Sequence, residues 1–140
     1  TNVPATVIIG SVLNSNLALG GRAPGSLGGL AIGGALFNSL GTMQITSAQI
    51  IGNVAQGAPA LGGGIYNGNL AAGTTPVITM GASVVLGNVA VSSGSGIGGG
   101  IYTLGTFYVP TPPPFQLGNR ILGNAATTSN PNVFGVLTPL

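Results

Sequence analysis

The side chains in this chain that could act as an acid, a base or a nucleophile are nearly all neutral. The sequence contains no His, Asp, Glu, Lys or Cys, and its charged residues are Arg22 and Arg120. General acid–base catalysis and the activation of a Ser or Thr nucleophile depend mostly on the missing residue types. Tyr66, Tyr102 and Tyr108 remain, but a tyrosine with no partner that lowers its pKa is a poor base. We therefore expect no catalytic residues and no enzymatic activity.

The glycine triplets Gly62–Gly64 and Gly98–Gly100 could suggest a loop that binds phosphate. A P-loop needs a Lys, which is absent, and no G-x-G-x-x-G lies between a strand and a helix pattern. Calcium sites need carboxylates, and the two arginines cannot supply the roughly six to ten phosphate contacts of a typical DNA-binding protein. We expect no cofactor, no metal ion and no nucleic-acid partner. The triplets then serve as tight corners where the backbone approaches itself closely.

These triplets belong to the first of two repeated phrases. The first phrase reads GGGIYN at residues 62–67 and recurs at 98–103 and, more loosely, at 33–38. The second phrase, an apolar pair followed by Gly-Asn-x-Ala, occupies residues 50–55, 85–90 and 121–126. Its glycines are 35 (87 − 52) and 36 (123 − 87) residues apart, a period typical of a solenoid. We expect a fainter first copy at residues 7–12, with Gly10 equivalent to Gly52 and Ser11 in the place of the Asn.

The segments between the phrases favour strands. Residues 42–52 and 77–87 are rich in Ile, Val and Thr and have almost none of the charged residues typical of exposed helix faces. Clusters of Gly, Asn, Ser and Pro separate these segments and form turns. We predict an all-β fold, a parallel β-helix (solenoid) of about four turns with irregular loop inserts. It forms a single domain over residues 1–140, with repeat units of roughly 5–32, 33–61, 62–97 and 98–126 and a C-terminal tail at 127–140.

The alternation of the two phrases resembles the Gly-rich right-handed parallel β-helix repeats of bacterial surface proteins, of the polymorphic outer-membrane protein and autotransporter passenger type. The resemblance extends over roughly residues 5–126. It implies a right-handed parallel β-helix that lies outside the cell or on its surface. The chain departs from these proteins in lacking their usual acidic residues.

Stacking of the units predicts three ladders of equivalent residues. Phe37, Tyr66 and Tyr102 should form an aromatic ladder, and Asn53, Asn88 and Asn124 an amide ladder, both with structural roles. An unpaired Arg is very costly in a narrow core, so Arg120 should point outward with its equivalents Gln49 and Val84. Side chains two residues further along a strand share that face. We therefore expect an exposed apolar stripe at Ile51, Leu86 and Leu122, with Ile50, Val85 and Ile121 in the core.

The expected function follows from the ends of the solenoid. Terminal strands expose unpaired edges, and the apolar segments at residues 7–9 and 133–137 carry no polar cap. We expect a structural subunit of an extracellular filament, sheath or surface layer, with other copies of itself as partners, joined head-to-tail and with the apolar stripe as a lateral contact. The most apolar run, residues 27–37, has 11 residues (37 − 27 + 1) and is shorter than the roughly 20 of a membrane span.

The alternative is an adhesin or passenger fragment of a larger cell-surface β-helix protein. In that case the stripe or the proline-rich segment at residues 110–115 would contact the target. A filament subunit should be assembled at any practical concentration, whereas an adhesin fragment should be a soluble monomer. Ice binding by a flat face is weaker still, because the Thr residues do not recur in equivalent positions of the units.

Overall fold

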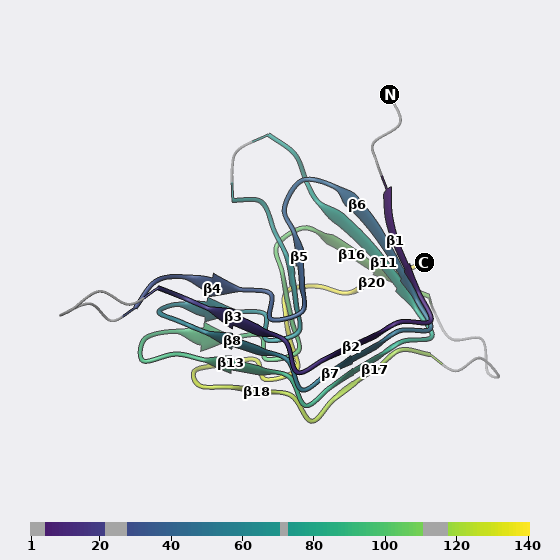
Figure 1. Cartoon of the computed structure of the whole chain (residues 1–140). Coiled ribbons are helices and arrows are strands. Elements are labelled where there is room, and N and C mark those ends of the chain that lie inside the picture. The colour runs from purple at the N-terminus through teal and green to yellow at the C-terminus, as the bar shows by residue number, and fades with distance from the viewer. Residues whose placement is uncertain (1–4, 22–27, 71–72, 111–117) are drawn as a thin grey trace.

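The computed structural model describes residues 5–21, 28–70, 73–110 and 118–140. These residues form an all-β parallel solenoid, with no helix among them. The chain passes through five parallel sheets in turn, and each strand pairs with the equivalent strand of the next pass (Figure 1). We call one pass a layer: the first layer is β1 to β5, and the last is β16 to β19. The all-β parallel solenoid predicted from the repeats is confirmed.

Each sheet is named here by a letter in the order in which the chain reaches it. Sheet A contains β1 (Ala5–Ile9), β6 (Thr42–Thr46), β11 (Val77–Gly81), β16 (Thr106–Val109) and β20 (Thr138–Pro139). Sheet B contains β2 (Val12–Asn14), β7 (Gln49–Ile51), β12 (Val84–Leu86) and β17 (Arg120–Leu122). Sheet C contains β3 (Leu17–Leu19), β8 (Val54–Gln56), β13 (Val89–Val91) and β18 (Ala125–Ala126). Sheet D contains β4 (Ala31–Ile32), β9 (Ala60–Leu61) and β14 (Gly96–Ile97), and sheet E contains β5 (Leu36–Asn38), β10 (Ile65–Asn67), β15 (Ile101–Thr103) and β19 (Val133–Phe134).

The solenoid has about three turns, whereas the repeats suggested about four. Sheets B, C and E each contain four strands, and four stacked strands are separated by three steps. Residues 127–140, which we expected to form a tail, contain β19 and β20 and extend sheets E and A.

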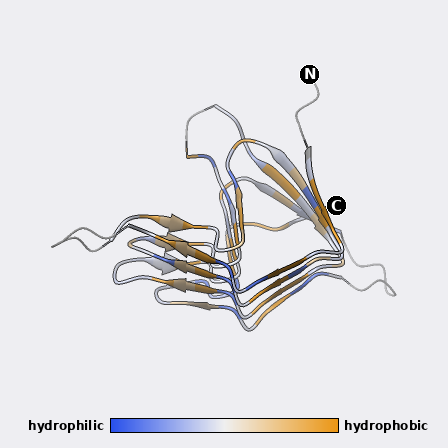
Figure 2. Ribbon diagram, in the orientation of Figure 1, coloured by the Kyte–Doolittle hydropathy of each residue, from blue (hydrophilic) through white to orange (hydrophobic). Residues whose placement is uncertain are grey.

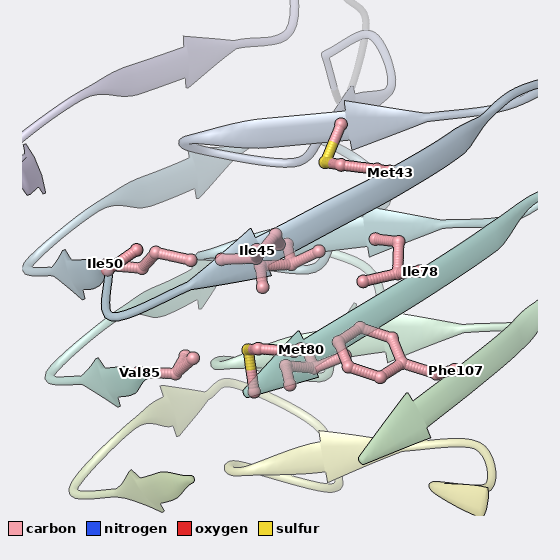
Figure 3. Close-up of a cluster of buried hydrophobic side chains, with 10 residues drawn as sticks. Met43, Ile45, Ile50, Ile78, Met80, Val85 and Phe107 are labelled. Carbon is pink, nitrogen blue, oxygen red and sulfur yellow. The ribbon is translucent and has the colours of Figure 1, made fainter. Parts of the chain in front are cut away.

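The cross-section has a wide body and a narrow arm. Sheets A, B and E surround the body, and sheets C and D form the arm (Figure 1). Large apolar side chains fill the body, and Figure 3 shows several of them, with Ile45 and Ile50 in one layer and Met80 and Phe107 in the layers below. The arm is filled by small side chains instead: Ala31, Ala55, Ala60 and Ala90. Apolar stretches recur at the same place in successive layers (Figure 2), as the repeated phrases require.

A backbone corner with positive φ joins sheets B and C. Gly52, Gly87 and Gly123 form it in three layers, with φ of 62°, 65° and 63°. In the first layer Ser15 takes this position with φ of 56°. The expected first copy at residues 7–12 is therefore wrong, because Leu13 pairs with Ile50 and the true copy begins at Leu13. Gly10 belongs to the earlier corner between sheets A and B. This corner also needs positive φ, which is why Gly10 resembled Gly52 in the sequence.

The glycine triplets lie where the body and the arm meet. A Cβ atom on Gly63 would lie 2.3 Å from the carbonyl oxygen of Gly99 and 2.4 Å from the carbonyl carbon of Val89. Such distances leave no room for any side chain. The triplets are thus close backbone crossings, in agreement with the structural role expected of them.

Candidate functional site: ladders and ends of the solenoid

The predicted amide ladder is present at the corner between sheets B and C. Asn53, Asn88 and Asn124 are buried there, and each accepts hydrogen bonds from the Asn one layer earlier. The backbone N and Nδ2 of Asn53 donate to Asn88 Oδ1 at 2.9 and 2.8 Å. The same two atoms of Asn88 donate to Asn124 Oδ1, both at 2.9 Å. The ladder therefore has a direction, with its donors facing the last layer and its acceptors facing the first.

Two further asparagines complete the ladder, and neither was predicted from the repeated phrases. Asn16 lies exposed at the first layer, and its backbone N and Nδ2 donate to Asn53 Oδ1 at 2.9 and 2.8 Å. At the other end, Asn132 Oδ1 accepts from the backbone N and Nδ2 of Asn124 at 3.2 and 3.1 Å. Asn132 precedes β19 within the last layer. Its Oδ1 accepts the hydrogen bonds from Asn124 that the Asn of a following layer would otherwise accept.

Two threonines of the last layer cover the third layer beside β14, the end strand of sheet D. The hydroxyl oxygens of Thr127 and Thr128 accept hydrogen bonds from the backbone N atoms of Ser92 (3.1 Å) and Gly96 (3.0 Å). Pro139 in β20 has no N–H to offer to a further strand, a usual protection of sheet edges. The expectation that neither end has a polar cap is therefore wrong for this end of the solenoid, because Asn132, Thr127 and Thr128 cap it from within the same chain.

In the first layer Ser11 Oγ donates to the carbonyl oxygen of Ile9 at 3.0 Å, but the outer face of this layer is unusually apolar. We call five of its outward side chains the first-layer patch: Val7 (53% exposed), Ile9 (66%), Val12 (62%), Leu17 (58%) and Leu19 (60%). The residues paired with them in the next layer are Gln44, Thr46, Gln49, Val54 and Gln56. Four of these five positions thus change from polar to apolar at the open end. The outward positions of the open end are therefore more apolar than those of the layer beside it.

The aromatic ladder is confirmed and is one residue longer than predicted. Ring centroids lie 5.4 Å apart for Phe37 and Tyr66, 5.4 Å for Tyr66 and Tyr102, and 4.6 Å for Tyr102 and Phe134. Burial raises the pKa of Tyr66 and of Tyr102 above the usual value, and the neighbouring Tyr102 also raises the pKa of Tyr66. A raised pKa is the opposite of what a catalytic base needs. The ladder therefore has the properties of packing.

A second polar ladder lies between sheets E and A. Asn38 Nδ2 donates to Asn67 Oδ1 at 3.0 Å, and Asn67 Nδ2 donates to Thr103 Oγ1 at 3.1 Å. All three residues are buried. They close the first phrase of each repeat, so their equivalent positions were the signal that could have predicted this ladder.

The predicted apolar stripe also faces outward. Leu86 and Leu122 are 36% and 38% exposed, and Ile51 is half-buried. Ile50 and Val85 are fully buried, and Ile121 packs against the same core cluster. Arg120 is exposed and pairs in register with Val84, as expected.

Arg22 and most of the proline-rich segment, residues 111–115, belong to residues that the structure does not describe. The described part of the chain has no His, Cys, Asp or Glu cluster that could hold a metal ion. It also has no helix that is long and apolar enough to cross a membrane.

The arrangement offers two kinds of chemistry: hydrogen bonding along ladders and sheet edges, and apolar contact at the first layer. Comparisons with known proteins give no family assignment, because no family model, no curated protein and no solved structure matches the chain.

Proposed function

We propose that the chain is a structural subunit of an extracellular filament, sheath or surface layer, which assembles with other copies by β-strand pairing at the ends of the solenoid. The first layer is the observation that carries this proposal. Its strands β1 to β5 are edge strands, and its outward positions are apolar where the next layer is mainly polar. The described strands β1 to β5 contain no charged residue and no proline, and an edge of this kind readily accepts another strand.

The composition supports assembly. Arg120 is the charged side chain within the described residues, so charge repulsion hardly opposes contact between copies. The resemblance of the two phrases to right-handed β-helix repeats of bacterial surface proteins supports a place outside the cell. Such an assembly is expected to respond little to pH, because the chain has no carboxylate or His side chain that titrates.

Negative-stain electron microscopy, together with sedimentation of the same samples in neutral and acidic buffer, tests this function. We expect fibres or sheets of constant width at both pH values. Monodisperse single solenoids at both pH values, at every practical concentration, would overturn the proposal.

The second candidate is an adhesin or passenger fragment of a larger cell-surface β-helix protein. The caps at this end of the solenoid favour it, because Asn132, Thr127 and Thr128 accept hydrogen bonds from the last two layers without a neighbouring molecule. On this account the chain is a soluble monomer, and the stripe at Ile51, Leu86 and Leu122 contacts a target. The sedimentation measurement separates the two candidates.

A further inference from the structure

We propose that copies join head-to-tail, with the first layer of one copy taking the place that β20 and Asn132 occupy at the last layer of the other. This inference rests on the proposed function and names the joint by which it would operate. On this account β20 and the Asn132 side chain occupy the joint in the single copy, and the next copy displaces both.

The register of sheet A supports this exchange. Ala5 pairs with Thr42, Thr42 with Val77, and Val77 with Thr106, so β1 and β16 occupy the same phase of the repeat. A β1 strand added to β16 in that register would set Thr6 beside Phe107 and Ile8 beside Val109, with Val7 outward beside Tyr108. This arrangement keeps the inward and outward alternation of every other layer, which a slip of one residue would reverse.

At present β20 occupies this place. Its partners on β16 are Tyr108, paired with Thr138, and Val109, paired with Pro139. The backbone N of Leu140 donates to the carbonyl oxygen of Val109 at 2.9 Å. Only two residues of β20 pair in this way, whereas β1 pairs over five residues with β6. A β1 strand from another copy would therefore form a longer ladder on β16 than β20 does.

The amide ladder supports the same exchange independently. Asn124 donates two hydrogen bonds to Asn132 Oδ1, in the geometry that Asn88 uses toward Asn124. In the register of sheets B and C, Asn16 of the next copy would take the place of Asn132. Asn16 is exposed, and within the described residues its Oδ1 accepts no hydrogen bond. Each end of the ladder thus offers what the other needs: donors at the last layer and an acceptor at the first.

The remaining side chains fit this joint. Leu17 would lie beside Ala125 in sheet C, and Phe37, which is 43% exposed, would stack on Phe134 in the aromatic ladder. Arg120 would face the uncharged Val12. Among the described residues, the joint therefore covers part of the first-layer patch without placing like charges together.

Disulfide trapping tests the geometry directly, because the chain has no Cys of its own. Strands paired across the joint lie about 4.8 Å apart, within the roughly 4.4–6.8 Å between Cα atoms that a disulfide spans. We expect the double variant Leu17→Cys with Ala125→Cys to give a ladder of covalent multimers on non-reducing gels after mild oxidation. Covalent dimers from Leu17→Cys alone would show joining of two first layers and would overturn the proposal.

Variants that remove β20 or the Asn132 side chain test this displacement. Deletion of residues 138–140, and separately Asn132→Ala, should each lower the concentration needed for assembly about ten-fold, because the next copy no longer has to displace the removed group. Asn16→Ala should raise that concentration by a similar factor. Gln49→Ala, which removes an exposed amide one layer away from the joint, is the matched control and should change it little.

The outcomes separate this inference from the proposed function. Assembly without the Leu17 to Ala125 disulfide, and with no response to the two cap variants, would overturn the joint and leave the structural function standing. Absence of assembly in the unmodified chain and in every variant would overturn both.

Discussion

Asn132 Oδ1 accepts two hydrogen bonds from Asn124, one from its backbone N at 3.2 Å and one from its Nδ2 at 3.1 Å. This pair ends the amide ladder with a residue of the same layer. It also makes the two ends of the solenoid different, because Asn16 at the first layer is exposed and its Oδ1 accepts no hydrogen bond from the described residues.

The first prediction concerns the centre of the amide ladder. Asn88→Ala should lower the free energy of unfolding by about 3 kcal/mol, since it leaves the buried N and Nδ2 of Asn53 without an acceptor. Urea unfolding followed by circular dichroism measures the loss. Asn14→Ala, at an exposed position, should cost less than about 0.5 kcal/mol. Equal losses for the two variants would contradict a stabilising ladder.

The glycine triplets give a second prediction. Gly63→Ala should cost about 3 kcal/mol or more, or prevent folding, because the new methyl group would collide with the backbone of Val89 and Gly99. Gly21→Ala is the control, since a Cβ there meets nothing within 4 Å. Thermal unfolding of the two variants provides the comparison. A Gly63→Ala variant as stable as Gly21→Ala would show that the crossing can relax.

A third prediction concerns the first-layer patch. Val7→Lys should leave the free energy of unfolding within about 0.5 kcal/mol, because Val7 is already 53% exposed. It should nevertheless prevent or strongly reduce assembly, since it puts a charge on the open edge. Gln44→Lys is the matched control, because Gln44 is exposed and in the same register one layer further in. If light scattering shows both variants assembling alike, the first layer is not the joint.

The pH dependence of stability gives a fourth prediction. The pKa values of Tyr66 and Tyr102 are raised in the folded state, so the folded protein holds these protons more tightly than the unfolded chain. Their contribution to stability is therefore complete below the usual tyrosine pKa of about 10 and is lost as pH rises through the raised values. We expect unfolding midpoints that are nearly constant between about pH 5 and 9 and that fall above about pH 10.

Replacing both tyrosines isolates this effect. The double variant Tyr66→Phe with Tyr102→Phe should keep the ladder packing but lose most of the decline above about pH 10. An unchanged decline in the double variant would assign the pH dependence to other groups.

Much of the fold could be predicted because residues at equivalent positions of the repeat stack on one another in the solenoid. Residues one period apart must be neighbours, so the aromatic ladder, the buried positions of Ile50 and Val85 and the outward position of Arg120 followed from the phrases alone. The second polar ladder followed the same rule and was missed only because the last position of the first phrase changes from Asn to Thr at Thr103.

The repeated phrases therefore specify the parallel solenoid, its layers and most of its registers. The ends of the solenoid depend on contacts that form only in the folded chain. Ser15 adopts the positive φ that glycine adopts in the other layers. The register of the first layer depends on this corner and on the pairing of its strands with β7 and β8. Asn132 takes the position of Gly100 in the glycine triplet and not that of a ladder asparagine, and its capping role depends on the reach of one side chain across the last layer. Periodicity specifies neighbours within a repeat, whereas the residues that end it are specified by three-dimensional contact alone.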